Sequence, residues 1–415
     1  MSLKALQRRF PFLVNSGYAT VSAASNVLLL VLLAIAGRWL TAGDYGRFRY
    51  ALALAMIVET VMDVGLGQVT VRAVARDRSG AGRLLQQVLG LKLVWVGLGL
   101  TLLAVVAPAL RSDRELVHLC YAMGLSAGLR SYLLTGRGVL QGIERFDLEA
   151  VLVVSDRVLL LASGLLALWL GYGAMGLAGA FVASRVIMLF AALALLGRVV
   201  GSVTPGFDRT AWRDLQSAAL PLGFFMIVLN MYSYIDTVIL GVMRSDAEVG
   251  QYGAAYTIYE GVTYAPAILS AVLTPRLSFL FTNDRAAHRA LLRRSLLSSG
   301  ALGLGLGGLT AVIAGPLMFL VFGDDFAGAV PPLQILAGGA LFVFSTWILH
   351  AAAISTNLDR RLLLTTIVGL SANVILNILF IPRWGISGAA WATVIAEALT
   401  VALLFVQVRQ RMREP

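Results

Sequence analysis

The chain has 415 residues, of which 59% are hydrophobic and only 13% are charged, and its mean hydropathy is +0.83. A soluble domain of this size cannot carry so much apolar sequence on its surface, so the composition predicts a polytopic membrane protein. The formal net charge of +11 does not indicate nucleic-acid binding, because the basic residues stand at helix ends in alternate loops and are not interleaved with aromatic residues.

The hydropathy pattern predicts an all-α integral membrane protein. A hydrocarbon core about 30 Å thick needs about 20 apolar residues per helix, and on that measure the chain has about twelve transmembrane helices. The basic N-terminal stretch lacks a small-residue cleavage site, so we expect a retained first helix and not a signal peptide. In chain order the expected spans are 15–40, 46–71, 84–107, 116–141, 147–170, 175–197, 214–242, 249–281, 291–320, 330–356, 361–381 and 385–408.

The loops between these spans differ in charge. Lysine and arginine favour the loops on one side by roughly three to one, which places both termini in the cytoplasm under the positive-inside rule. Every expected loop is short. No room remains for a soluble catalytic domain, so we expect a protein that is not an enzyme.

The two halves of the sequence resemble each other. At an offset of 204, the stretch GRWLTAGDYGRFRYA aligns with GVMRSDAEVGQYGAA, so that Gly46 pairs with Gly250. Three further matches keep the same order with small drifts in offset, which predicts two six-helix lobes in the same orientation. The expected lobes are an N-lobe at 1–199, a cytoplasmic linker with an interfacial helix at 200–213, and a C-lobe at 214–415.

Four short motifs are typical of one transporter family. They are GDYGRF after the first helix, MDVGLG late in the second, YIDTVILGVMRSDAEVGQY across the seventh and eighth, and IPRWGISGAAWATV at the start of the last. With these motifs the chain resembles the polysaccharide-export flippases (Wzx-like) of the multidrug/oligosaccharidyl-lipid/polysaccharide (MOP) exporter superfamily. The resemblance implies a MATE-like pair of pseudo-symmetric lobes, a central cavity that opens alternately to each side, and location in the bacterial cytoplasmic (inner) membrane.

The resemblance also implies a function. The expected cargo is an undecaprenyl-pyrophosphate-linked oligosaccharide, translocated for surface polysaccharide biosynthesis, and the expected partners are membrane lipids and the polysaccharide polymerase machinery. The alternative is a small-molecule or drug antiporter of MATE-like or major-facilitator type. The stretch ARDRSGAGR is similar to the facilitator loop signature, but Ala73 stands where that signature has glycine, and Ala81 adds a residue. A polymerase or ligase would need a longer outer loop than 323–332.

Ionisable residues at membrane depth cost roughly 2.5 to 3.5 kcal/mol on insertion scales, so they usually pair or line a pathway. A helix rises about 1.5 Å per residue, which sets the depth of each position within its span. This puts three arginines and two acids at middle depth of the N-lobe, but acids and no arginine at middle depth of the C-lobe. The residues are Arg130, Arg157, Arg185, Glu59 and Asp156 in the N-lobe, and Glu260, Glu397 and the shallower Asp236 in the C-lobe.

The arginines suggest an anion site. Because the guanidinium fork matches phosphate oxygens, we predict that Arg130, Arg157 and Arg185 bind the pyrophosphate headgroup. Glu59 and Asp156 would then hold the arginine side chains in place. The alternative is that these charges only neutralise one another.

The remaining acids and bases have weaker assignments. Glu260, Glu397 and Asp236 are candidate sites for a coupling proton or sodium ion, the only cofactors expected, although neighbouring Tyr or Thr hydroxyls could simply hold these carboxyls. Asp63 is expected to be structural or a gate contact, and Lys92 to extend its amine toward the membrane surface. The histidines lie far apart, so no metal site is predicted.

Overall fold

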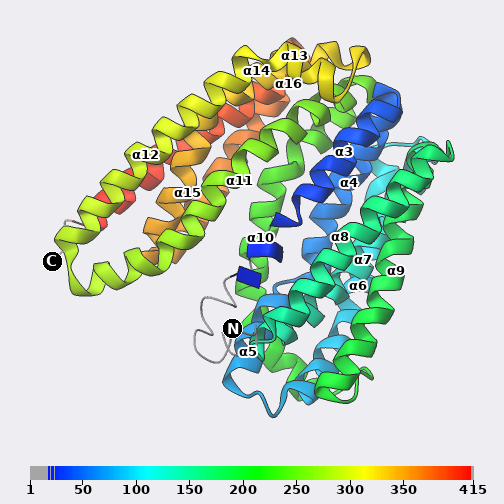
Figure 1. Cartoon of the computed structure of the whole chain (residues 1–415), viewed down its shortest axis with the longest axis vertical. Coiled ribbons are helices and arrows are strands. Elements are labelled where there is room, and N and C mark those ends of the chain that lie inside the picture. Colours follow the sequence, from blue (N-terminus) through cyan, green and yellow to red (C-terminus); the bar gives the residue numbers. More distant parts are fainter. Residues whose placement is uncertain (1–16, 19, 23, 413–415) are drawn as a thin grey trace, which may run out of the picture. The chain divides into compact units, whose positions relative to one another are not determined.

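The computed structural model describes residues 17, 18, 20–22 and 24–412, and all that follows concerns them. Within that part of the chain every regular element is a helix (Figure 1). The chain divides into two compact units. Unit 1 comprises the described parts of Met1–Trp39 together with Ala51–Asn230, and unit 2 comprises Leu40–Tyr50 together with the described parts of Met231–Pro415.

Unit 1 is a bundle of long helices. In it α7 packs against α5, α6 and α9, while α8 packs against α9 and α3. The helices are α3 (Val27–Trp39), α5 (Leu66–Arg76), α6 (Ala81–Leu110), α7 (Arg114–Gly142), α8 (Phe146–Trp169) and α9 (Gly173–Val200), with the later part of α4 (Ala42–Asp63) and the first part of α10 (Arg209–Met243).

Unit 2 is built around α15, which packs against α11, α12 and α16. It also takes in the start of α4 and the end of α10, so each of these two helices contributes to both units. The other helices are α11 (Asp246–Asn283), α12 (Arg285–Val312), α13 (Ala314–Val321), the 3-10 helix η1 (Asp324–Ala329), α14 (Val330–Gly338), α15 (Ala340–Ser355) and α16 (Asp359–Arg411). The lobe and linker boundaries expected from the sequence stay a prediction.

The helices follow the twelve expected spans. Nine described helices are long and apolar enough to cross a bilayer, and the bent pair 324–338 and 340–355 makes a tenth. The 53-residue α16 contains two expected spans, divided at Gly385, whose φ of 56° is open to glycine without strain. The remaining span is α7, which carries Arg130 and Arg137 within its 29 residues. The fold is therefore that of an all-helical polytopic membrane protein.

The second expected span is broken into α4 and α5. Val64 and Gly65 both have positive φ, 43° and 80°, and this turns the chain between the two helices. Gly223 of α10 packs directly on the break, since a Cβ at Gly223 would lie 2.3 Å from the Val64 carbonyl oxygen. The DVGLG sequence is therefore a packed bend within a span.

Two glycines that the internal repeat aligns lie against each other in unit 2. A Cβ at Gly46 would lie 1.8 Å from the Asp246 carbonyl oxygen, and a Cβ at Gly250 would lie 1.9 Å from the Ala42 carbonyl oxygen. Asp246 and Ala42 are themselves aligned at the same offset of 204. The first turns of α4 and α11 thus meet in a reciprocal contact.

Candidate functional site

The charged residues expected in the N-lobe converge in unit 1, and Glu59 and Arg130 form one ion pair. Nη1 of Arg130, on α7, donates to both Glu59 carboxylate oxygens, on α4, at 2.8 and 2.6 Å. The same nitrogen lies 3.6 Å from the Met56 sulfur. Glu59 is buried, so the pair joins α4 to α7 inside the bundle.

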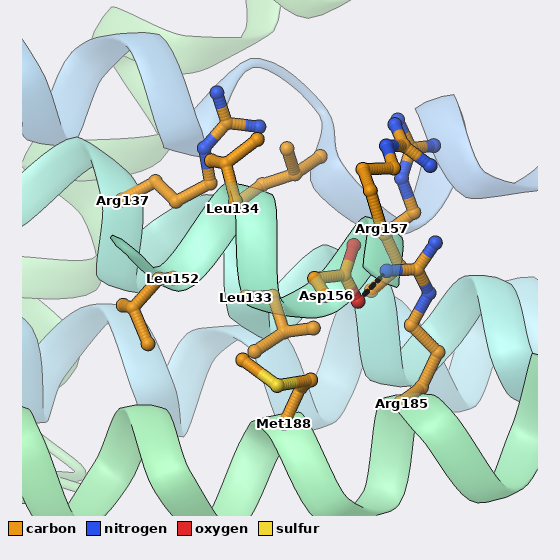
Figure 2. A pocket seen from close by; sticks show the side chains of 10 residues that line it. Leu133, Leu134, Arg137, Leu152, Asp156, Arg157, Arg185 and Met188 are labelled. Carbon is orange, nitrogen blue, oxygen red and sulfur yellow. Dashed lines mark hydrogen bonds and ion pairs between the residues drawn. The ribbon is translucent and has the colours of Figure 1, made fainter. Parts of the chain in front are cut away.

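A second ion pair joins α8 to α9. Arg185 donates from Nη1 to Asp156, as Figure 2 shows, and the arginine is buried. Nε of Arg185 is buried and makes no hydrogen bond. Asp156 thus holds one side of the guanidinium group and leaves a donor on another side unused.

Arg157 differs from its neighbours. Its Nη2 donates to the Asn26 amide oxygen at 2.9 Å, and no carboxylate forms an ion pair with it in the described part of the chain. The side chain is 7% exposed, and its Nε makes no hydrogen bond. Arg157 is therefore a buried arginine without an anionic partner of its own.

A third ion pair was not among the sequence candidates. Arg137 of α7 meets the buried Glu149 of α8 at 2.7 Å from Nη2 and 2.9 Å from Nε. Ser22 and Gln141 also donate to this carboxylate, at 2.8 and 3.2 Å. Arg137 falls inside the expected span 116–141. That position within a span is the sequence signal that points to a half-buried Arg137.

Two adjoining cavities run through this cluster. The first has a volume of about 20 Å³, room for about one water molecule, and is lined by Arg130, Leu133, Leu134, Arg137, Leu152, Val153, Asp156, Arg157, Arg185 and Met188 (Figure 2). The second has about 230 Å³ and is lined by Ser22, Asn26, Arg137, Gln141, Phe146, Glu149 and Val153. Because Arg137 and Val153 line both, the arginine cluster adjoins a larger polar space.

The cluster has more positive than negative charge. Its four arginines, Arg130, Arg137, Arg157 and Arg185, face three carboxylates, those of Glu59, Glu149 and Asp156. Three arginines are paired one to one, and the charge in excess is that of Arg157. The arrangement can therefore accept an anion without breaking any of the three ion pairs completely.

Asp63 and Lys92 form a separate buried contact. Lys92 is 0% exposed, so the expectation that its amine extends to the membrane surface is wrong. Its Nζ donates to Asp63 Oδ1 at 2.6 Å and to Ser131 Oγ at 2.7 Å. The amine has enough acceptors inside the protein, so nothing draws it to the surface. Because Asp63 is the last residue of α4, the contact ties the α4–α5 bend to α6 and α7.

Two candidate coupling residues in unit 2 are held by neutral donors. Asp236 is 2% exposed and accepts from Tyr252 Oη at 2.5 Å, the Thr237 backbone N–H at 2.7 Å and Thr393 Oγ1 at 3.4 Å. The buried Glu397 accepts from Thr346 Oγ1 at 2.9 Å. Neither carboxyl has an ion pair with lysine or arginine among the residues described.

Glu260, the third candidate, interacts electrostatically with Arg49. Arg49 lies on α4, in the segment Leu40–Tyr50 that belongs to unit 2, and its side chain is buried. An arginine from the expected N-lobe segment 1–199 therefore lies in the same unit as Glu260. Arg49 falls within the expected span 46–71, and that position is the signal the sequence offers for its burial.

Comparison with known proteins places this fold in a family. The model of the family "Polysaccharide biosynthesis protein" matches residues 13–281. In Haloferax volcanii, a "Probable flippase AglR" is 28% identical over 174 residues, which is 40% of this chain and 36% of the relative. A "Probable low-salt glycan biosynthesis flippase Agl15" from the same organism is 25% identical over 173 residues, 41% of this chain and 37% of the relative. The matches thus span little more than a third of these relatives.

Two solved structures share the fold over nearly the whole chain. An inward-facing MATE family multidrug resistance transporter of the MOP superfamily superposes with a TM-score of 0.77 at 16% identity, covering 93% of this chain and 94% of that one. The lipid II flippase MurJ in an inward closed conformation superposes with a TM-score of 0.75 at 14% identity, covering 95% and 89%. The chain has the fold of these two transporters, and because the family model matches more than half of the sequence, the chain belongs to the polysaccharide biosynthesis protein family.

Proposed function

We propose that the protein is a flippase that moves an undecaprenyl-pyrophosphate-linked oligosaccharide across the cytoplasmic membrane by alternating access, for surface polysaccharide biosynthesis. Family membership, two relatives named as probable flippases and the MOP fold support this proposal. We expect transport without bond-making, both termini in the cytoplasm, and membrane lipids and a polysaccharide polymerase as partners.

The observation that carries the proposal is the state of Arg157. A charge at membrane depth is costly unless it is paired, and Arg157 has only the Asn26 amide oxygen. An arginine without a counter-ion inside a bundle suits a protein whose ligand supplies the negative charge. A pyrophosphate diester carries such charge and accepts the paired N–H groups of guanidinium forks.

The ion pairs suggest how the headgroup is bound and released. Unused Nε donors on Arg157 and Arg185 are available to phosphate oxygens, and the cavity of about 230 Å³ beside Arg137 gives a polar approach. The cavity of about 20 Å³ among the arginines must widen for the headgroup to enter. Glu59 and Asp156 would then keep Arg130 and Arg185 oriented while the site is empty, and their like charge would favour release.

We further propose that Asp236 and Glu397 bind the coupling ion, a proton or sodium. Both carboxyls are buried and receive hydroxyl donors but no ion pair from lysine or arginine within the described residues. Such a carboxyl can take up a cation and give it back as its surroundings change. Glu260 is the weaker candidate for the ion site, because it already interacts electrostatically with the positive charge of Arg49.

The flippase proposal is tested in a strain that lacks the gene. We expect lipid-linked oligosaccharide to accumulate on the inner leaflet, where a glycosidase added to spheroplasts cannot reach it. Wild-type protein should restore access. The Arg157→Ala variant should fail to restore glycosidase access. The control variant Arg114→Ala, which removes an exposed arginine in unit 1, should restore it. Normal outer-leaflet access in the deletion strain would overturn the proposal.

A small-molecule or drug antiporter is the second candidate. The similarity to a MATE transporter and the unpaired carboxyls in unit 2 favour it. The excess arginine in unit 1 argues against a cationic drug as cargo, because like charges repel. Uptake of cationic dyes into vesicles that contain the purified protein distinguishes the two, since the flippase proposal predicts no dye transport.

A further inference from the structure

Unit 1 has a second basic cavity, which shares no lining residue with the arginine cluster. Its volume is about 660 Å³. The lining comes from α5, the turn before α6, the start of α6 and the start of α10, and consists of Val69, Arg72, Ala73, Arg76, Asp77, Ser79, Gly80, Arg83, Leu84, Gln87, Ala211, Asp214, Leu215 and Ala218. None of the functions proposed above uses this cavity.

The sequence of α5 gives the cavity both basic and apolar lining residues. Arg72 and Arg76 are four residues apart and share one helix face, which is exposed. Val69 lies three residues before Arg72 on the same side of α5, and Leu66 and Val69 enter an apolar cluster with Leu215 of α10. Arginines thus stand at the rim of the cavity, while Val69, Leu84 and Leu215 form an apolar floor.

Backbone contacts fix the walls. Asp77 Oδ1 accepts from the Ser79 and Gly80 backbone N–H groups, both at 3.1 Å, and so shapes the turn between α5 and α6. The linker before α10 is held on α6, because the Gly206 N–H donates to the Gln86 carbonyl at 2.7 Å. The cavity is therefore a fixed feature of unit 1.

The cavity lies at the level of lipid headgroups. One candidate span ends at Arg76, the next begins at Ala81 and a third begins at Arg209, and the cavity is lined by residues beside all three ends. Under the positive-inside rule this end of the spans faces the cytoplasm. Basic cavities between helices at this level are suited to anionic lipid headgroups.

The charges select the ligand further. Arg72, Arg76 and Arg83 form no ion pair in the described part of the protein, and all three are exposed. Hydrogen bonding from Ser79 lowers the pKa of Asp77, so this carboxylate stays ionised at neutral pH. Together with Asp214 it leaves the lining one positive charge in excess. That balance fits one phosphodiester better than a multiply charged pyrophosphate.

We propose that this cavity binds an anionic phospholipid with a glycerol headgroup. Arg72, Arg76 and Arg83 would take the phosphodiester as bidentate guanidinium contacts, and Asp214 and Gln87 would meet the glycerol hydroxyls. An acyl chain would cover the apolar floor. A soluble phosphate compound would leave that floor exposed to water, so the lipid is favoured over a free anion.

The test is native mass spectrometry of the purified full-length protein with defined lipids. Wild-type protein should retain phosphatidylglycerol and should not retain phosphatidylethanolamine, and soluble glycerol phosphate should not displace the lipid. The double variant Arg72→Gln/Arg76→Gln should lower the apparent affinity for phosphatidylglycerol about tenfold or more. The matched control is Arg289→Gln/Arg293→Gln on α12, which also removes two exposed arginines four residues apart.

The outcomes separate the alternatives. Equal loss of lipid in both double variants would show that only the total charge of the protein matters, and the proposal would fail. Displacement by soluble glycerol phosphate would identify a free-anion site instead and would also overturn it. Thermal unfolding of each variant in detergent shows whether the protein is folded; if the double variant is not, Arg83→Gln is measured in its place, with Arg289→Gln as its control.

Discussion

Arg157 donates a hydrogen bond to the Asn26 amide oxygen, although every other arginine of its cluster has a carboxylate partner. Asn26 and aspartate have nearly the same shape, so a single substitution can supply the missing charge. Asn26→Asp should give Arg157 an ion pair and remove the excess positive charge of the cluster.

We therefore expect Asn26→Asp to weaken binding of undecaprenyl pyrophosphate about tenfold while the protein stays at least as resistant to heat as wild type. Asn26→Ala, which removes the hydrogen bond without adding charge, should weaken binding much less. Binding is measured by titrating the purified protein with the lipid. Equal effects of the two variants would show that the charge of Arg157 does not bind the ligand.

The Arg130–Glu59 pair predicts a coupling between two substitutions. Glu59→Gln leaves a largely buried arginine without its counter-ion, and breaking such a pair costs about 3 kcal/mol. Glu59→Gln/Arg130→Gln should be more stable than Glu59→Gln alone. Unfolding in detergent, followed by tryptophan fluorescence for all four proteins of the cycle, measures the coupling. Additive effects would mean that the pair contributes nothing to stability.

Replacing Asp63 and replacing Lys92 should destabilise the protein to different extents. Lys92 is 0% exposed, whereas the Asp63 side chain is 17% exposed. Asp63→Asn should therefore destabilise the protein more than Lys92→Met, because it leaves the amine buried without a counter-charge while Lys92→Met leaves a partly hydrated carboxylate. The double variant should fall near wild type, as apolar replacements of buried pairs often do. Melting temperatures of the three variants test the order.

The reciprocal glycine contact predicts a strong effect of one methyl group. Gly46→Ala and Gly250→Ala should each lower the melting temperature, because the added Cβ would lie within 2 Å of a backbone oxygen on the other helix. Gly43→Ala is the matched control on α4, where a Cβ would meet only Thr41 Oγ1 at 3.9 Å. This control should be neutral, or more stable by up to about 1 kcal/mol through helix propensity.

Replacing Asp236 should uncouple transport from the ion gradient. Asp236→Asn keeps the size of the side chain but removes its charge, so transport should become slow and insensitive to the pH or sodium gradient. Asp325→Asn, at an exposed position, should leave that dependence unchanged. The measurement is flipping in proteoliposomes with imposed gradients. A variant whose rate still follows the gradient would remove Asp236 from the coupling mechanism.

The order and extent of the helices could be predicted from the sequence. Span length, loop charge and the repeat depend on many residues at once, and even the division of α16 at Gly385 lies where the sequence analysis ended one span and began the next. The α4–α5 bend was missed because Val64, a residue that rarely adopts positive φ, is held there by packing against Gly223. The positive φ of Val64 is a tertiary effect, and only Gly65, with its own φ of 80°, gives a local sequence signal of the bend.

The candidate site was only partly predictable. Depth counting selects Glu59, Arg130, Asp156, Arg157 and Arg185, but it cannot say which acid meets which arginine, since that depends on how the helices are rotated. Arg137 and Glu149 lie near the ends of their spans, where charged residues usually face water, so only the packed structure shows them as partners.

The contact of Gly46 with Gly250 also bears on how such a chain can arise. Each glycine faces the first-turn carbonyl of the other helix, so between two identical halves the same contact would be isologous, one residue against its own symmetry mate. Duplication of a gene for one half would then create both sides of the contact in a single event. Once the halves are fused, neither copy can gain a side chain there without pushing against the other.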